Sequence, residues 1–366
     1  MVVGCGALGN EVLKNLALMG IKNIVIIDFD KVEAGNLSRS VLFNETDNVI
    51  GKNKVEVAAR ALRKIDTDIK LTLIYGDIGT DVGLGLIKDV DVVIGCVDNR
   101  RARYCINRMC MRARKPWIDG GISQLEGMVR IFEPDKSCYA CSLSSEHLLD
   151  LKKRFSCSGN ISRSVQTESA PTTPVIASVI GAIQVQEALK LIQNKTEEST
   201  SLKTLSGKMF YYDGKHLTSG TATFEAFDDD CPVHEPWEPI IESSITANST
   251  VKEAVTILQK LLGTETVSIL LINDCFVDYI FDKETDKEYE VMLPGRKIEE
   301  FITDSPILNR KPVSAYYQNE IWSFSENSLY NGLTLKKIGV PSNDIIKIKC
   351  YDSDYNNYRY FYIRMQ

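Results

Sequence analysis

The stretch from Met1 to Asp30 restricts the fold of this chain more than any other. A short apolar run at residues 2–3 leads into Gly4-Cys5-Gly6-Ala7-Leu8-Gly9, where a helical pattern begins, and a second apolar run at residues 23–27 ends in Asp28-Phe29-Asp30. Glycines at this spacing permit a tight turn and a close approach of the backbone to phosphate, and an acid about twenty residues later can accept a hydrogen bond from a ribose hydroxyl. The pattern therefore predicts a nucleotide site that includes Gly4, Gly6, Gly9, Asp28 and Asp30.

Apolar runs alternate with helical periodicity through the first half of the chain. The patterns predict helices at residues 54–65 and 101–114, and strands at residues 24–27, 71–74, 90–96, 117–118 and 127–132. Parallel strands joined by helices build a doubly wound sheet, whose ligand lies beyond the carboxyl ends of the strands. We therefore expect an α/β fold with a Rossmann-like, doubly wound mixed sheet.

The pattern changes after Cys141. Serines, charges and short runs fill residues 142–170, an apolar helix is predicted at residues 174–192, and residues 211–227 are expected to form the last strands of the core. Prolines and acidic residues at 235–242 indicate a domain boundary. We expect residues 1–240 to form one domain, and residues 241–366 to form a smaller α+β domain whose first helix, up to residue 262, is capped by Thr250.

Length, charge and cysteine usage exclude several classes of protein. With 366 residues, of which 44% are hydrophobic, the chain is long enough for two domains with full cores. A formal net charge of −6 argues against a nucleic-acid partner. No apolar run approaches the roughly 18 residues of a membrane span, and the N-terminus has no secretion signal, so we expect a cytoplasmic protein. Ten cysteines with one Cys-x-x-Cys suit reduced thiols and a metal site better than a disulfide framework.

Polar residues further along the chain separate phosphate chemistry from hydride transfer. Asn36 and Arg39 follow the acidic pair, Lys54 opens the next predicted helix, and Asp98-Asn99 follows a predicted strand. If these strand ends converge, Lys54 and Arg39 face phosphates and Asp98 can hold Mg²⁺. The alternative is that the two cations are solvated surface charges and that Asp98 is a turn residue.

Eight ordered motifs resemble one family. They lie at residues 4–9, 28–30, 36–39, 51–56, 97–99, 138–141, 170–174 and 231–233. Together they resemble the adenylating domain of the ubiquitin-activating (E1) or ThiF-MoeB-HesA superfamily, which includes the bacterial enzymes that activate sulfur-carrier proteins for molybdopterin and thiamine synthesis. The resemblance covers residues 1 to about 235.

The resemblance implies a reaction and a role for each motif residue. It implies that Asp30 binds the ribose of ATP, that Asn36 and Arg39 contact the triphosphate, that Lys54 is the catalytic lysine, and that Asp98 is the Mg²⁺-associated acid. In the implied reaction the C-terminal carboxylate of a ubiquitin-like protein attacks the α-phosphate, and pyrophosphate leaves. Because two anions approach each other, cationic side chains and Mg²⁺ are needed to offset their repulsion.

The resemblance also implies a structural zinc site. In the family a Cys-x-x-Cys such as Cys138 and Cys141 is paired with a second one after the adenylating core, where this chain has Cys231 and His234. Neutral imidazole can replace thiolate in a tetrahedral Cys₃His site. The alternative is that the cysteines are reduced bystanders and that His234 is an ordinary surface residue.

Cys157 decides between two kinds of enzyme. It lies in the irregular stretch where E1-type enzymes carry the cysteine that takes the activated protein as a thioester, and Arg154 and Arg163 are near it in sequence, where they would favour the thiolate. The alternative is a spectator thiol, because some activators of sulfur carriers need no thioester. The remaining lone cysteines are expected to serve packing: Cys5, Cys96, Cys105, Cys110, Cys275 and Cys350.

The two ends of the chain suggest partners. Residues 333–341 followed by a predicted strand resemble the end of a β-grasp fold, which E1 enzymes place here to recruit an E2-like conjugating enzyme; the alternative is an α+β appendage for dimerisation or for holding the carrier protein. The first strand is short, so we expect that a native N-terminal segment is missing. Family members work as homodimers or paired subunits, and a partner often supplies a further arginine.

Three functions follow. The favoured one is an E1-like enzyme that adenylates a ubiquitin-like protein, carries it on Cys157 and passes it to a conjugating enzyme. The second is an adenylyltransferase that activates a sulfur carrier in cofactor biosynthesis and forms no thioester. The third, a non-catalytic scaffold, is disfavoured because Arg39, Lys54 and Asp98 are all present.

Overall fold

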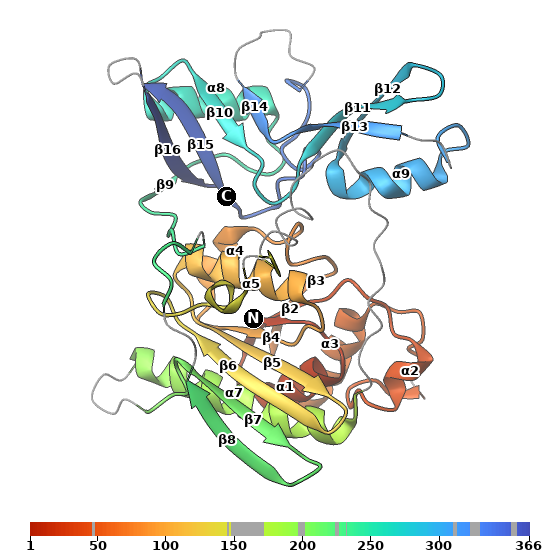
Figure 1. Cartoon of the computed structure of the whole chain (residues 1–366), viewed down its shortest axis with the longest axis vertical. Coiled ribbons are helices and arrows are strands. Elements are labelled where there is room, and N and C mark those ends of the chain that lie inside the picture. The colour runs from red at the N-terminus through yellow and green to blue at the C-terminus, as the bar shows by residue number, and fades with distance from the viewer. Residues whose placement is uncertain are drawn as a thin grey trace. The chain divides into compact units, whose positions relative to one another are not determined.

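The chain forms two compact units (Figure 1). A computed structural model describes residues 1–45, 48–144, 146–147, 172–196, 202–223, 227–231, 233–309, 313–322, 330–352 and 357–366. Unit 1 comprises the described residues of Met1–Gly79, Ile87–Leu143 and Glu168–Pro236, and unit 2 comprises those of Thr80–Leu86, Ser144–Thr167 and Trp237–Gln366. The units follow spatial contacts and are not continuous in sequence. The predicted domains at residues 1–240 and 241–366 stay a prediction.

Unit 1 contains the predicted doubly wound sheet. Among its described residues, eight strands lie in the order β3-β2-β1-β4-β5-β6-β7-β8. The first five in this order pair in parallel, and β6, β7 and β8 add antiparallel pairs. The strands are β1 (Val2–Val3), β2 (Asn23–Ile27), β3 (Lys70–Ile74), β4 (Val93–Gly95), β5 (Trp117–Ser123), β6 (Glu126–Phe132), β7 (Lys208–Asp213) and β8 (Thr218–Thr223). The sheet confirms the predicted α/β class.

Helices cover both faces of this sheet. In Figure 1, α1, α3 and α7 lie on one face and α5 lies on the other. The predicted helix at residues 54–65 is confirmed at both ends by α3, and α5 differs by one residue at each end from its predicted range. The helices and turns of this part of the chain are α1 (Ala7–Leu18), α2 (Ala34–Leu37), α3 (Lys54–Ile65), α4 (Leu84–Asp89), α5 (Arg100–Ala113), the 3₁₀ turn η2 (Ala140–Ser142) and α7 (Pro174–Thr196).

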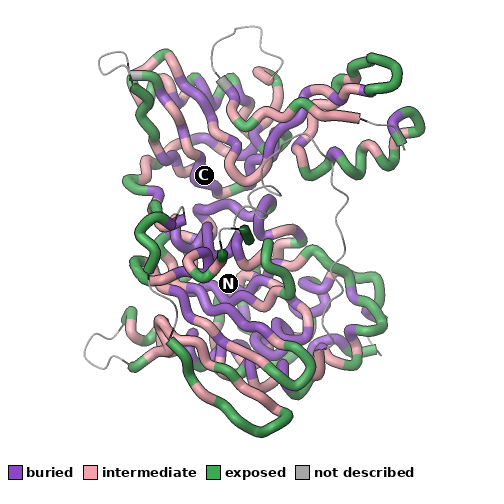
Figure 2. Tube along the Cα trace, viewed as in Figure 1, coloured by how far each residue is buried: buried purple, intermediate pink, exposed green. Residues whose placement is uncertain are grey.

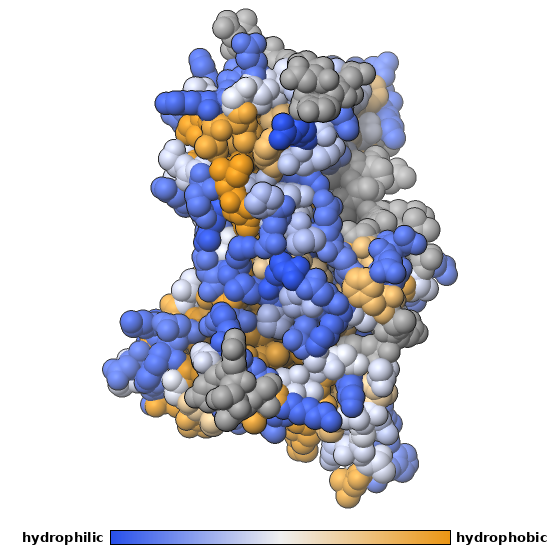
Figure 3. Space-filling model, turned by 90° about the vertical axis from the view of Figure 1, so that its left-hand side faces the viewer, coloured by the Kyte–Doolittle hydropathy of each residue, from blue (hydrophilic) through white to orange (hydrophobic). Residues whose placement is uncertain are grey.

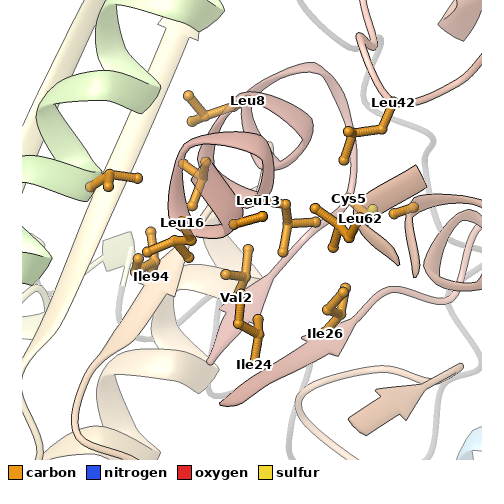
Figure 4. Packing of buried hydrophobic residues seen from close by; sticks show 14 of the residues in the cluster. Val2, Cys5, Leu8, Leu13, Leu16, Ile24, Ile26, Leu42, Leu62 and Ile94 are labelled. Carbon is orange, nitrogen blue, oxygen red and sulfur yellow. The ribbon is translucent and has the colours of Figure 1, made fainter. Parts of the chain in front are cut away.

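The core of unit 1 lies between the sheet and α1. Leu13 and Leu16 of α1 point toward Val2 of β1 and toward Ile24 and Ile26 of β2 (Figure 4). This packing requires apolar residues three and four positions apart on the helix and two apart on the strand, which is the pattern that predicts both elements. The central strands are therefore buried, whereas the β8 strand is mostly exposed (Figure 2).

Helix α7 is the exception to the expectation that no apolar run approaches membrane-spanning length. Its mean hydropathy is 1.6 over an 18-residue window, which is enough to cross a membrane by length and composition alone, a test that core helices also pass. In unit 1 it packs against α1 and β5, and it buries the polar residues Gln184 and Glu187. We therefore describe α7 as a core helix of unit 1.

Unit 2 contains two smaller antiparallel-dominated sheets. Among the described residues, one has the order β14-β10-β15-β16-β9, and the other has the order β12-β11-β13. The strands are β9 (Ile240–Glu242), β10 (Val267–Leu270), β11 (Phe276–Asp282), β12 (Lys287–Pro294), β13 (Val313–Gln318), β14 (Glu320–Trp322), β15 (Ile345–Asp352) and β16 (Asn357–Arg364). The helices are α8 (Val251–Leu262), the 3₁₀ turn η4 (Gly295–Lys297) and α9 (Ile298–Asp304). The β-grasp resemblance stays a prediction.

The face of the molecule in Figure 3 is mostly hydrophilic and carries smaller hydrophobic areas. Large apolar side chains are also exposed in the part of the chain that the structure describes, among them Leu18, Met19 and Val175. Single exposed apolar residues are normal on protein surfaces. We therefore assign no function to them.

The start of α8 matches its prediction. The Thr250 hydroxyl accepts a hydrogen bond from the Glu253 amide at 3.2 Å, and the Glu253 carboxylate accepts one from the Thr250 amide at 2.8 Å. This reciprocal capping box satisfies two backbone donors that the helix cannot satisfy itself. Gly263 ends the helix in the left-handed conformation, which glycine adopts without strain.

We expect Thr250→Ala to lower the free energy of unfolding by about 1 kcal/mol, because the Glu253 amide loses its acceptor. Urea denaturation followed by circular dichroism measures the change. Thr256→Ala is the matched control, since the Thr256 hydroxyl donates to the Lys252 carbonyl inside the same helix and caps nothing. Equal stability of the two variants would contradict the assigned cap.

Candidate nucleotide and metal sites

The glycine-rich loop is closed on its protein side and open on the other. Gly4 has a φ of +94°, and a Cβ atom there would lie 2.4 Å from the Cys96 carbonyl oxygen. A Cβ atom on Gly9 would lie 2.0 Å from the Gly4 carbonyl oxygen, whereas nothing lies within 4 Å of one built on Gly6. Residues 4–9 therefore form a tight turn with open space above Gly6, at the amino end of α1, which suits an anion such as phosphate.

The ends of three neighbouring strands meet at this loop. Strand β1 lies between β2 and β4, and the chain leaves these strands at Gly4, Asp28 and Cys96. The Gly4 amide donates to the Ile27 carbonyl at 2.8 Å, and the Cys96 amide donates to the Val3 carbonyl at 2.8 Å. The strand order reverses here, which is where open α/β sheets bind their ligands.

The two predicted acids after β2 differ in their surroundings. The half-buried Asp28 carboxylate accepts hydrogen bonds from the amides of Cys5 at 2.6 Å and Asp30 at 2.7 Å. Burial raises the pKa of Asp28 above its ordinary value, against the effect of Lys54 and of both amides. Asp28 thus braces the glycine-rich loop against the next loop. The Asp30 side chain is 49% exposed, and it is the acid that a ribose hydroxyl can reach.

Lys54 is held beside Asp30. It is the first residue of α3 and is only 8% exposed, and its Nζ atom lies 2.7 Å from Asp30 Oδ2. The Lys54 amide also donates to the Asp30 carbonyl at 3.0 Å. This geometry disagrees with the alternative that Lys54 is a solvated surface charge. A buried ammonium group beside the loop can contact a bound phosphate.

Asn36 and Arg39 follow in the same region with different roles. Asn36 is buried, and its Oδ1 atom accepts a hydrogen bond from the Glu33 amide at 3.0 Å as part of the α2 capping box. Arg39 is half-buried, and its guanidinium has no hydrogen bond or ion pair with a described residue. It therefore remains available for an anionic ligand.

Asn10 is a residue of this site that the sequence analysis misses. It is fully buried in α1, and its amide nitrogen donates to the carbonyls of Cys5 at 2.8 Å and Gly6 at 2.9 Å. Its Oδ1 atom accepts from the Leu42 amide at 2.9 Å. Asn10 thus ties the glycine-rich loop to the segment after Arg39. The available signal is a polar residue within the helical pattern that follows the glycines.

Asp98 is exposed at the carboxyl end of β4. The Asn99 side chain donates to Asp98 Oδ1 at 3.2 Å and accepts from the Ala102 amide at 2.8 Å, so Asn99 is the N-cap of α5. An exposed carboxylate beside a phosphate loop suits Mg²⁺, which keeps several waters and takes one or two protein carboxylates. The assignments of Asp98 and Asn99 to the cofactor stay predictions.

The four predicted zinc ligands lie together. The donor atoms of Cys138, Cys141, Cys231 and His234 are all within 4.8 Å of one another. The Sγ atom of Cys138 lies 3.8 Å from that of Cys231 and 3.7 Å from that of Cys141, and Cys141 Sγ lies 3.3 Å from His234 Nε2. Zn–S bonds of about 2.3 Å at tetrahedral angles separate two sulfur ligands by about 3.8 Å. The cluster can therefore hold a metal ion such as zinc.

The surroundings of the cluster also suit a metal. The buried Asn107 side chain donates to Cys138 Sγ at 3.3 Å, and Phe227 stacks on the His234 ring with 4.3 Å between centroids. The hydrogen bond between the Cys231 and Cys138 thiols lowers the pKa of Cys138 to about 5 and raises that of Cys231. Thiolate is the form of cysteine that binds metals.

Cys157 lies outside the described residues. Among the described cysteines, burial raises the pKa of Cys105 and Cys350 to about 11. It raises the pKa of Cys5, Cys96 and Cys110 further. Protonated, buried thiols are poor nucleophiles. These five residues therefore agree with the packing role that the sequence analysis predicts for them. The same prediction is wrong for Cys275, which is disulfide-bonded rather than a lone packing thiol.

The sequence profile of the ThiF family matches residues 1–233. The chain belongs to the ThiF family. The match covers the glycine-rich loop, Lys54, Asp98 and the three cysteines of the metal cluster, and it confirms the predicted resemblance to E1-like adenylating enzymes. Residues 234–366 lie outside the matched range of this ThiF-family chain.

Relatives of two kinds are similar to this ThiF-family chain. The SAMP-activating enzyme E1 of Haloferax volcanii is 28% identical over 233 residues, which cover 64% of this chain and 78% of that protein. The molybdopterin-synthase adenylyltransferase of Salmonella typhimurium is 32% identical over 217 residues, 58% of this chain and 78% of that protein. The SUMO-activating enzyme subunit 2 of Dictyostelium discoideum is 36% identical over 143 residues, 38% of this chain and 21% of that protein. The crystal structure of E. coli MccB with ATP is 26% identical, with a TM-score of 0.49, over 64% of this chain and 65% of that one.

We expect protein purified without chelator to contain about one zinc ion per chain, measured by inductively coupled plasma mass spectrometry, because the four donors match a closed tetrahedral site. His234→Ala should lose most of this metal. His216→Ala is the matched control, since that exposed histidine pairs with Asp213, away from the cluster. Wild-type protein with less than about a tenth of an equivalent of zinc would exclude the site.

Proposed function

We propose that this protein uses ATP to adenylate the C-terminal carboxylate of a ubiquitin-like protein. The observation that carries the proposal is the ion pair between buried Lys54 and exposed Asp30 beside the open glycine-rich loop, where the strand order of the sheet reverses. Membership of the ThiF family supports the same reaction. A hydride-transfer enzyme needs the loop and the acid but has no need of Lys54, Arg39 and Asp98 around the phosphates.

Different residues would bind different parts of the substrate ATP. The loop at Gly6 and the amino end of α1 would hold phosphate, and Asp30 would accept a hydrogen bond from a ribose hydroxyl. The Lys54 Nζ atom lies 2.7 Å from Oδ2 of Asp30, so the other carboxylate oxygen would serve the ribose while Lys54 faces the phosphates. Arg39 supplies a second cation, and Asp98 would hold Mg²⁺, which neutralises phosphate charge when bound.

The reaction is a substitution at phosphorus. A carboxylate oxygen of the carrier protein forms a bond to the α-phosphorus, the bond from that phosphorus to the bridging oxygen breaks, and pyrophosphate leaves with the electron pair. Negative charge builds up on the phosphoryl oxygens and on the leaving group. We assign the stabilisation of this charge to Lys54 and Arg39. Cations in fixed positions stabilise the charge of a transition state more strongly than water does.

The relatives support two versions of this function. The Haloferax protein is named as a SAMP-activating enzyme E1, the Dictyostelium protein as subunit 2 of a SUMO-activating enzyme, and the Salmonella protein as a molybdopterin-synthase adenylyltransferase. In the first version, which we favour, the Cys157 thiolate attacks the acyl carbon of the adenylate, the bond from that carbon to the phosphate oxygen breaks, and AMP leaves. The protein then passes from this thioester to an E2-like conjugating enzyme bound by residues 241–366. In the second version the carrier is a sulfur carrier and the chemistry stops at the adenylate.

Further proposals concern assembly and location. We propose that the protein works in the cytoplasm as a homodimer or with a paired subunit, as the superfamily resemblance implies. A non-catalytic scaffold is disfavoured, because Arg39, Lys54 and Asp98 are all present in the chain.

We expect Lys54→Ala to reduce carrier-dependent exchange of labelled pyrophosphate into ATP by at least about a hundredfold, because a transition-state cation is lost. Lys52→Ala is the matched control, since Lys52 is an exposed lysine two positions before Lys54. An unchanged exchange rate in Lys54→Ala would remove Lys54 from the mechanism.

The thioester is tested by intact mass under non-reducing conditions after incubation with ATP, Mg²⁺ and ubiquitin-like proteins that end in glycine. We expect a covalent adduct that is released by added thiol and is absent in Cys157→Ala, because a thioester is cleaved by thiols. Pyrophosphate exchange without such an adduct would contradict the E1-type version and support the sulfur-carrier version.

A further inference from the structure

Asp119 is a fully buried carboxylate held by two arginines. It lies on β5, and Arg103 Nε donates to its Oδ1 atom at 2.9 Å. Arg130, its cross-strand neighbour on β6, donates to Oδ2 from Nη2 and from Nε, the latter at 3.2 Å. A buried carboxylate whose two oxygens accept charge-assisted hydrogen bonds from two different arginines has a fixed geometry. No residue of this cluster has a role in the reaction proposed above.

Arg103 extends the cluster to the loop that carries Asp98. Its Nη2 atom donates to the Val97 carbonyl at 2.8 Å and to the Gly120 carbonyl at 3.2 Å. The Val97 carbonyl belongs to the peptide bond that leads directly into Asp98. On the other side of Asp98, Asn99 is fixed as the N-cap of α5. The backbone of Asp98 is therefore held from both directions, although its side chain is exposed.

Electrostatic coupling reaches the same residue. Burial alone would lower the pKa of Arg103, but the Asp119 carboxylate and its hydrogen bond raise it above its ordinary value, with smaller contributions from Tyr139 and Asp98. Arg103 is thus a permanent cation that holds the Val97 carbonyl next to Asp98. Mg²⁺ takes one or two protein carboxylates and demands near-ideal octahedral geometry, so the position of such a carboxylate matters.

We propose that Arg103, anchored by Asp119, is a positioning residue that fixes the Asp98 loop for the Mg²⁺ of the bound nucleotide. The inference rests on the proposed function, because Asp98 receives its role there. Arg103 contacts neither the phosphates nor the metal in this assignment; it acts through the Val97 carbonyl. Arg130 balances the charge of Asp119, so Asp119 keeps a cationic partner when Arg103 is replaced.

The test measures the affinity for ATP by isothermal titration calorimetry, once with Mg²⁺ and once with EDTA. The ratio of the two dissociation constants reports the contribution of the metal and does not require turnover. We expect the wild-type protein to bind ATP more tightly with Mg²⁺. Arg103→Gln should reduce this ratio by about tenfold, the usual effect of losing a group that orients a metal ligand, and should leave the affinity in EDTA unchanged within error.

Three further single variants and one double variant make the result specific. Arg100→Gln is the matched control, because it removes an exposed arginine from the first turn of the same helix, and it should keep the wild-type ratio. Asp98→Asn should abolish the metal contribution, and adding Arg103→Gln to it should cause no further loss, because both changes act through one site. Arg103→Lys retains the positive charge but not the planar guanidinium group, so the ratio of the two dissociation constants should fall in this variant as well. It takes the place of Arg103→Gln in the test if the glutamine variant fails to fold.

Distinct results would overturn this inference and the proposed function. A wild-type ratio in folded Arg103 variants, or an additive loss in the double variant, would overturn the positioning role. A wild-type protein whose affinity for ATP is the same with Mg²⁺ and with EDTA would overturn it as well. Normal Mg²⁺-linked ATP binding without any pyrophosphate exchange would instead count against the proposed adenylation and leave the role of Arg103 intact.

Discussion

The close contact between the glycine-rich loop and the end of β4 is the constraint on which the site depends. Gly4 can lie against the Cys96 carbonyl only because it has no side chain and accepts a positive φ. This contact keeps the loops after β1 and β4 adjacent where the strand order reverses. The open space above Gly6 and the Asp98 loop therefore border one region, and a ligand that contacts one lies near the other.

Around this contact the site is built from side chains that hold backbone rather than ligand. Asp28 joins the glycine-rich loop to the loop after β2, Asn10 joins it to the segment after Arg39, and Arg103 holds the loop before Asp98. Each of these residues is buried or half-buried and satisfied by protein atoms. The residues that a ligand can contact lie next to these bracing side chains. The site therefore keeps its geometry before the ligand binds.

The sequence predicted those elements that depend on residues close to one another in the chain. The helix at residues 54–65 and the Thr250 cap depend on neighbouring residues, and the structure confirms both. Strand β5 is longer than the predicted residues 117–118, because it pairs with β6 from Trp117 to Ser123, and the residues of β5 alone do not reveal this partner. The brace function of Asp28 could not be predicted for the same reason, since a carboxylate near a glycine-rich loop looks like a ligand contact until its amide partners are known. The clustering of Cys138 with His234 was predicted only through the family resemblance.

The amide of Leu42 is a built-in reporter of the glycine-rich loop. It donates to the side chain that also binds the carbonyls of Cys5 and Gly6, although it lies 32 residues after Asn10 in the sequence. In a sample labelled with ¹⁵N, the chemical shift of this one resonance and the rate at which its proton exchanges with solvent would follow the state of the loop. The fold thus supplies a spectroscopic probe at a position where no label has to be attached to the loop itself.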